Sequence, residues 1–152
     1  MGYRSEIAYG VKVDDIILKD NATEEDKKIG ADGIFLVMLT EMQQDPIAGK
    51  CFDNTYEIND YLVVDKEKKS ILFSANSVKW YDSFEDVQAH ERLYQIMEEY
   101  ANVYGDMEEL ARNPISCAFI RIGEEIEDIE ERGNGDDPWG IMNVYRGIDI
   151  HI

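Results

Sequence analysis

Clustered carboxylates are the side chains in this sequence whose types and spacing come closest to a chemical site. Six of the eight residues from Glu124 to Glu131 are acidic. If this stretch were helical, several of the carboxylates would share one face, and Ca²⁺ or Mg²⁺ binds oxygen ligands of that kind. However, no EF-hand spacing is present, and nothing holds two acids about a substrate pocket as in a glycosidase. We therefore expect neither a metal site nor a catalytic acid pair.

Nucleophilic catalysis also lacks a recognisable arrangement. His90 and His151 are the only histidines, and neither lies in a triad-like context. Cys51 and Cys117 form no redox or metal-binding motif, so we interpret them as free thiols in a reducing cytosol. The sequence contains no glycine-rich phosphate loop. We expect a protein that is not an enzyme and needs no cofactor, with His90 on or near the surface of a helix.

The distribution of charge is the strongest functional signal in the chain. The net charge is −18, and residues 82–137 contain 17 Asp or Glu against four Arg. Such a surface repels nucleic acid and anionic membranes, but it attracts a basic groove on a protein that normally grips nucleic acid. The more specific hypothesis is that the acidic surface mimics the phosphate backbone of a nucleic acid. The alternative is an acidic domain without such a role. A homodimer is also compatible with the sequence.

Two sets of residues follow from these hypotheses. The set expected to contact a basic partner is Glu124, Glu125, Glu127, Asp128, Glu130, Glu131, Asp136 and Asp137, with Tyr81 and Trp139 as aromatic anchors. The alternative is a pocket that binds a nucleotide or signalling ligand through Arg4, Trp80, Arg121 and Arg146. Guanidinium groups bind phosphate and aromatic rings stack on bases. The competing interpretation places the arginines in internal salt bridges and uses Trp80 and Tyr81 to close the core.

The chain must position these residues on strands and helices. Strand-like patterns occur in Glu6–Val13, Tyr56–Asp65, Ser70–Trp80, Cys117–Ile122 and Met142–Ile152. Residues 66–69 have the length of a hairpin connection. Cys117–Ile122 is almost wholly apolar and predicts a central strand that leads into the acidic run. We expect Ile126 and Ile129 to pack that run rigidly against the core.

Two segments carry helical signals. The first is predicted to begin at Thr23 and to end before Pro46, although two glycines interrupt it and Ile34–Leu39 is apolar enough to be a buried strand. The second has an amphipathic pattern, with Ser83 as the expected N-cap and Gly105 at its end.

The element order β-α-β-β-α-β-β favours an α+β fold. We expect a two-layer sandwich in which a mainly antiparallel sheet of about five strands carries two helices on one face, as a variant of the ferredoxin-like topology. Residues 1–152 are of the length of a single domain. Neither a signal peptide nor a membrane-spanning apolar stretch is recognisable, so we expect a cytoplasmic protein.

Three stretches are similar to small proteins encoded by bacteriophages and prophages. They are MGYRSE at Met1–Glu6, VKWYDSF at Val78–Phe84, and FIRIGE at Phe119–Glu124, which continues to DIEE at Asp128–Glu131. Small acidic phage proteins are often inhibitors of host defence, including anti-CRISPR and anti-restriction proteins that occupy nucleic-acid-binding clefts. The resemblance therefore implies a non-enzymatic inhibitor of a basic host protein in the host cytoplasm. It supplies no catalytic residue.

Overall fold

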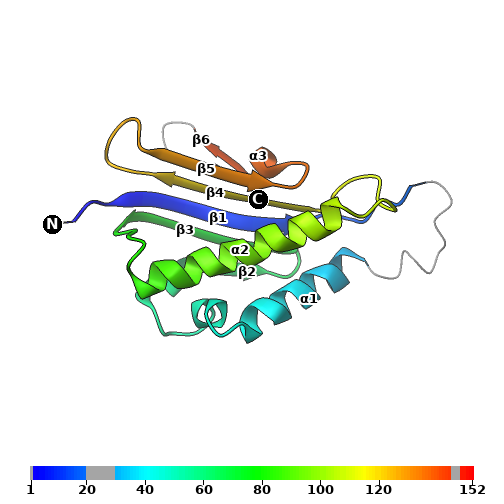
Figure 1. Ribbon diagram of the computed structural model, residues 1–152, viewed down its shortest axis with the longest axis horizontal. Helices are drawn as coiled ribbons and strands as arrows, with labels where there is room; N and C mark the ends of the chain where they lie inside the picture. Colours follow the sequence, from blue (N-terminus) through cyan, green and yellow to red (C-terminus); the bar gives the residue numbers. More distant parts are fainter. Residues whose placement is uncertain (1, 20–29, 145–147) are drawn as a thin grey trace.

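The fold is built around β1 (Ser5–Val13), the middle strand of a five-stranded sheet (Figure 1). The computed structural model describes residues 2–19, 30–144 and 148–152. β1 lies between β3 (Ser70–Val78) and β4 (Ile115–Ile122), while β2 (Leu62–Asp65) and β5 (Ile129–Asn134) form the edges. Every neighbouring pair is antiparallel. β1 is buried along most of its length, as a strand covered on both faces must be.

This strand order confirms the predicted class of fold. The order β4-β1-β3-β2, with one helix between β1 and β2 and another between β3 and β4, is the ferredoxin-like arrangement. β5 is added beyond β4 as a fifth strand. The four residues 66–69 form the connection between β2 and β3, as their length predicted.

Two helices cover one face of the sheet, α1 (Ala31–Gln44) and α2 (Glu85–Gly105), as Figure 1 shows. Ile34–Leu39 lies inside α1, so the helical interpretation of that run is confirmed. Its predicted start at Thr23 lies outside the described residues. Phe84, not Ser83, occupies the N-cap of α2 and makes no side-chain cap bond. Acidic side chains in the first turn of α2 interact favourably with the helix dipole in place of a cap.

The opposite face carries a smaller layer made by the C-terminal residues. It contains the short helix α3 (Pro138–Ile141) and an antiparallel pair, β6 (Met142–Val144) with β7 (Ile148–Ile150). Ile141 and Met142 pack with residues of β1 and β4 in a second apolar cluster. The expectation of one strand over Met142–Ile152 is therefore wrong. The fifth strand of the sheet is formed instead by β5, which contains part of the acidic run.

The segment before β2 is also more irregular than predicted. η2 (Ala48–Cys51) and η3 (Glu57–Tyr61) are 3₁₀ turns, so only the end of the predicted strand Tyr56–Asp65 is extended. The Asn59 amide group donates hydrogen bonds of 2.7 Å and 2.9 Å to the backbone carbonyls of Lys50 and Asp53. Such side-chain bonds to nearby backbone compete with a strand ladder.

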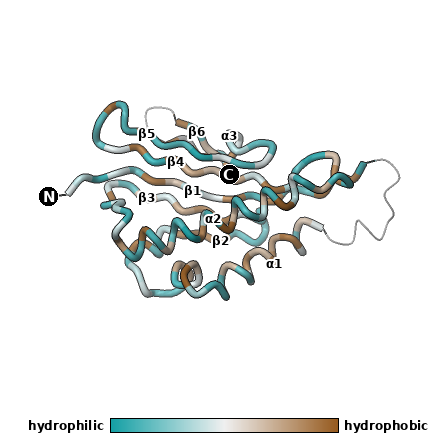
Figure 2. The backbone as a smooth tube through the Cα atoms, viewed as in Figure 1, coloured by the Kyte–Doolittle hydropathy of each residue, from teal (hydrophilic) through white to brown (hydrophobic). Residues whose placement is uncertain are grey.

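Hydrophobic residues concentrate in the layer between the helices and the sheet, and hydrophilic residues follow β5 and its flanking loops (Figure 2). Among the described residues, no helix is both long enough and apolar enough to cross a bilayer.

Candidate functional site

The acidic run forms a hairpin between β4 and β5 rather than a helix. Residues 123–128 connect the strands, and Ile122 pairs with Ile129. Ile126 is 94% exposed and Ile129 is 43% exposed. The expectation that these two isoleucines anchor the run to the core is therefore wrong, because one lies at the hairpin tip and the other points away from the helices. Glu124, Glu125 and Glu127 are exposed at this tip.

Asp128 is held inside the hairpin by two partners. Its carboxylate accepts hydrogen bonds from Arg121 at 2.6 Å and 3.0 Å and from the Tyr3 hydroxyl at 2.6 Å. These bonds, led by the one from Arg121, lower the pKa of Asp128 to about 2. This carboxylate is satisfied within the molecule, so it is a positioning group for the hairpin and not a free charge for a partner.

Glu130 is likewise paired within the molecule. It lies 3.4 Å from the Nε of Arg121 and 3.0 Å from the Nε of Arg132. Arg132 also donates to Glu91 of α2 at 2.8 Å and 2.9 Å, and its guanidinium lies 3.9 Å from the centre of the Phe119 ring. A continuous ion-pair ladder results, in the order Asp128, Arg121, Glu130, Arg132 and Glu91, and joins the hairpin to α2.

The ladder borders an open groove of about 1170 Å³, which we call the hairpin groove. Its aromatic lining consists of Tyr3, Tyr56, Trp80, Tyr81 and Tyr94. The backbone N–H of Tyr3 donates to the Tyr81 hydroxyl at 2.6 Å and ties the N-terminal residues to this wall. Trp80 is buried, and its Nε1 has no hydrogen-bond partner among the described residues.

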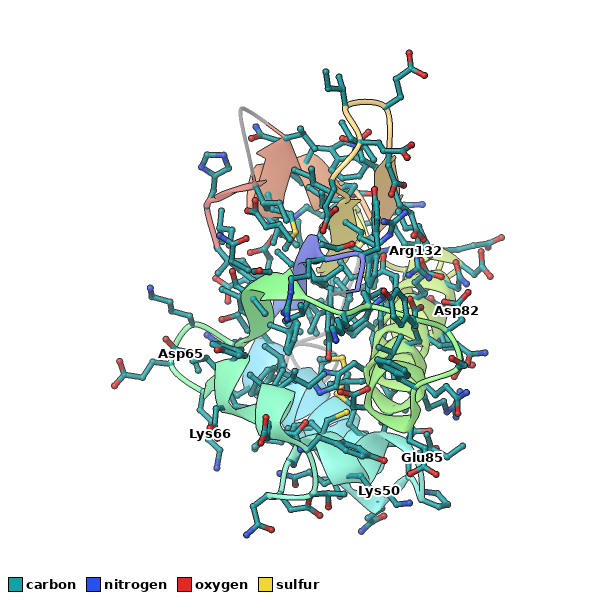
Figure 3. The ribbon with its side chains drawn as sticks, turned by 90° about the vertical axis from the view of Figure 1, so that its left-hand side faces the viewer. Lys50, Asp65, Lys66, Asp82, Glu85 and Arg132 are labelled. Atoms are coloured by element: carbon teal, nitrogen blue, oxygen red, sulfur yellow. The ribbon has the colours of Figure 1, made fainter. Side chains whose placement is uncertain are left out.

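The charges that remain unpaired in the hairpin groove are mainly negative. Figure 3 shows Arg132, Asp82 and Glu85 on the same side of the molecule beside α2, with Lys50 below them. All three arginines of the lining, Arg92, Arg121 and Arg132, lie within 3.5 Å of a carboxylate. In contrast, Asp82 and Glu85 have no ion-pair partner among the described residues, and Lys50 is the one lining cation without one there.

The predicted partner-binding residues separate into different surfaces. Tyr81 lines the hairpin groove, whereas Trp139 in α3 lies against Gly133 on the opposite face of the sheet. Glu131 alternates with Glu130 along β5 and is exposed toward that opposite face.

Asp136 accepts the backbone N–H of Asn113 at 2.9 Å. Asp137 is exposed and begins α3.

The predicted ligand-binding residues are only partly brought together. Trp80 and Arg121 line the hairpin groove, but Arg4 does not; its guanidinium donates to the Ser77 carbonyl at 2.7 Å, and its backbone N–H donates to Glu124 at 2.7 Å. Arg146 lies outside the described residues.

His90 is the residue that sequence reasoning misplaced most. It is fully buried in α2, where its Nδ1 accepts from the Tyr9 hydroxyl at 2.5 Å and its Nε2 donates to Asn59 Oδ1 at 2.7 Å. Burial lowers the pKa of His90 to about 4, so the ring is neutral at pH 7. The spacing of His90 from Leu93 and Met97, at three and seven residues, was the available signal that it faces the core.

The described residues do not supply an activated nucleophile or a metal-binding cluster. Burial raises the pKa of both Cys51 and Cys117 to about 12, which keeps these thiols protonated. No group of three His, Cys, Asp or Glu in the described part of the chain is placed to hold a metal ion.

Glu91, Arg132 and Tyr3 are among the residues of the groove that sequence reasoning did not single out. The two-residue spacing of Glu130 and Arg132 was a signal for a shared strand face, but their contact with α2 depends on long-range packing.

Comparison with known proteins adds no further assignment, since no family model, curated protein or solved structure matches this chain significantly.

Proposed function

We propose that this protein is a non-enzymatic binding protein that blocks a basic, nucleic-acid-handling protein of a bacterial host. The observation that supports the proposal is that the arginines of this surface are paired within the molecule, whereas several of its carboxylates are exposed. The arginines around the hairpin groove are neutralised internally, while Glu124, Glu125 and Glu127 remain exposed at the hairpin tip. Of these three, Glu124 also accepts the backbone N–H of Arg4 at 2.7 Å. A cationic cleft gains from such exposed carboxylates, and a polyanion is repelled by them.

The ion-pair ladder gives this acidic surface a defined shape. Asp128 and Glu130 fix both strands of the hairpin through Arg121, and Arg132 links the hairpin to α2. A surface that is already ordered loses less conformational entropy when it binds. Mimicry of a phosphate backbone requires charges that are both numerous and fixed in place; Glu124, Glu125 and Glu127 would supply the charge, on a hairpin that the ladder orders.

Charge reversal at the hairpin tip tests the proposal. We expect E124K/E125K/E127K to lose binding to the host protein captured from a bacterial lysate by the wild type at about 0.05 M NaCl. We also expect that the captured protein releases from the wild type at about 0.5 M NaCl and that DNA or RNA competes with the wild type for it.

A matched control carries the same change of charge away from the hairpin. Asp15, Asp60 and Glu67 are exposed. Asp15 and Glu67 lie near the end of β1 remote from the hairpin, and Asp60 precedes β2, at the edge of the sheet opposite β5. The variant D15K/D60K/E67K should still capture the target. Equal loss in both variants would show that only net charge matters, and equal retention in both would remove the hairpin from the interface.

Binding of a nucleotide or signalling ligand in the hairpin groove is the second candidate function. It is favoured by one observation, namely that Trp80, Tyr81 and Arg121 line a single groove. The pairing of Arg121 with Asp128 and Glu130 opposes it, because a phosphate would have to displace these carboxylates. A rise in Tm with a nucleotide that is lost in Tyr81→Ala would support this function, and no shift across a nucleotide panel would exclude it.

A further inference from the structure

A second groove lies on the other flank of α2, between α2 and α1. It has a volume of about 540 Å³, and we call it the helix groove. Its lining is formed by Leu36, Val37, Thr40, Glu41, Gln44, Asp45 and Tyr100. None of these residues lines the hairpin groove, although Asp45 is ion-paired with Arg92 of that groove, so the two grooves adjoin without sharing a lining residue.

The helix groove has an apolar floor that no other described residue covers. Leu36 is 50% exposed and Val37 is 62% exposed, although the neighbouring Ile34, Phe35 and Met38 are buried in the core. On α2, Val103 is 55% exposed and follows Tyr100 by three residues, which places both on one face. Of these exposed aliphatic side chains, Leu36 and Val37 line the groove itself. Exposed apolar side chains that lie together mark a surface for contact with another molecule.

The rim of the helix groove is acidic. Its charged lining residues are Glu41 and Asp45, and no cation is among the lining residues. Arg92 of α2, which borders the groove, is already paired with Asp45 at 3.1 Å and with Glu99 at 3.5 Å. Glu41 accepts a hydrogen bond from the Tyr100 hydroxyl across the groove. An occupant must therefore present apolar side chains flanked by positive charge.

We propose that the helix groove binds an amphipathic α-helix of a partner protein, with aliphatic residues along one face and Lys or Arg on both sides of it. Leu36 to Gln44 is a stretch of nine residues, or about 12 Å of α1 from the first Cα to the last, which matches about two turns of a docked helix. Two turns present anchors at positions i, i+4 and i+7. A second copy of this chain is a poor occupant, because it would bring two acidic rims together.

A pair of synthetic peptides tests this proposal directly. Both contain about 18 residues of Leu, Lys and Ala in the same composition, one arranged with an apolar face and flanking lysines and the other scrambled. Titration into ¹⁵N-labelled protein should shift the amide signals of Leu36, Val37, Thr40 and Tyr100 with the patterned peptide. The scrambled peptide has equal charge but no apolar face, so it should bind at least about tenfold more weakly.

Variants separate this groove from the acidic hairpin. L36Q/V37Q should weaken binding of the patterned peptide about tenfold, whereas V63Q/I126Q removes two exposed aliphatic side chains elsewhere and should leave it unchanged. E124K/E125K/E127K should also bind the peptide normally. Peptide binding by the helix groove would therefore be established even if the hairpin proved to have no partner.

Three results would overturn the proposal. The first is equal binding of the patterned and scrambled peptides, which would indicate attraction by net charge alone. The second is a set of shifts confined to the β4–β5 hairpin or the hairpin groove. The third is occupation of the groove by this chain itself. It would be seen either as self-association that L36Q/V37Q abolishes or as nuclear Overhauser effects between residues 20–29 and Leu36.

Discussion

His90 shows how one side chain links three parts of the core. Its two ring nitrogens bond to Tyr9 of β1 and Asn59 of η3, while the ring itself belongs to α2. The Phe73 ring lies 4.6 Å from it, centre to centre. Charging an imidazole in these apolar surroundings is unfavourable, and this is the physical cause of its lowered pKa.

The stability of the fold should therefore depend on the protonation of His90. The pKa is about 4 in the folded protein against an ordinary value of 6.5, so the unfolded chain binds the extra proton between these values. The contribution of neutral His90 to the free energy of unfolding is fully present above pH 6.5 and is lost as the pH falls toward 4. We expect the wild type to lose about 3 kcal/mol relative to His90→Gln over this range, in urea unfolding at a series of pH values.

The comparison with the variant is essential because the many carboxylates also titrate at low pH. Their contribution is common to both proteins and cancels in the difference. A stability difference between wild type and His90→Gln that stays constant from pH 7 to pH 4 would show that His90 is not the group responsible.

At the scale of elements, the turn after β5 sets the position of the outer layer. Gly135 has a φ of 94°, a conformation that side chains disfavour, and a Cβ there would lie 2.1 Å from the Ile115 carbonyl oxygen. Asp137, two residues further on, donates its backbone N–H to the Ser116 hydroxyl at 3.1 Å. The turn thus leads the chain from the edge strand over β4 and into α3.

Substitution of this glycine should be strongly destabilising. Gly135→Ala is expected to lower the free energy of unfolding by about 2 kcal/mol or more, since it combines backbone strain with a steric clash. Gly30→Ala is the control, because a Cβ at Gly30 meets no atom of the described residues within 4 Å. The control should cost less than about 1 kcal/mol, the usual range at a helix N-cap. Similar urea midpoints for both variants would contradict this interpretation of the turn.

At the scale of the whole molecule, the net negative charge opposes folding but favours binding to a basic partner. A charge of −18 on 152 residues repels itself in the compact state. Raising NaCl from about 0.01 M to about 0.15 M shortens the screening length from roughly 30 Å to 8 Å. The urea midpoint should therefore rise with salt, while binding to a basic partner should weaken. A midpoint that falls with salt would instead indicate that the ion-pair ladder dominates the electrostatic contribution to stability.

Much of the architecture was predictable because it depends on local patterns. The alternation in Glu6–Val13 predicted a strand, the apolar run Cys117–Ile122 predicted a central strand, and the helical spacing after Ser83 predicted α2. The acidic run was predicted poorly for a physical reason. Its local sequence suits either a charged helix or a hairpin, and only pairing of Ile122 with Ile129 distinguishes them.

The sequence by itself determined the class of fold and the sign of the surface charge. Both follow from composition and short-range periodicity, which act along the chain. Only the tertiary structure decided which carboxylates remain free. Arg121 pairs with Asp128 from only seven residues away, but the Tyr3 hydroxyl that also donates to Asp128 and the Glu91 carboxylate that pairs with Arg132 lie 125 and 41 residues away. Such pairings depend on the completed packing of sheet against helix, and they reduce the long acidic run to three exposed glutamates at the hairpin tip, with Glu131 on the opposite face.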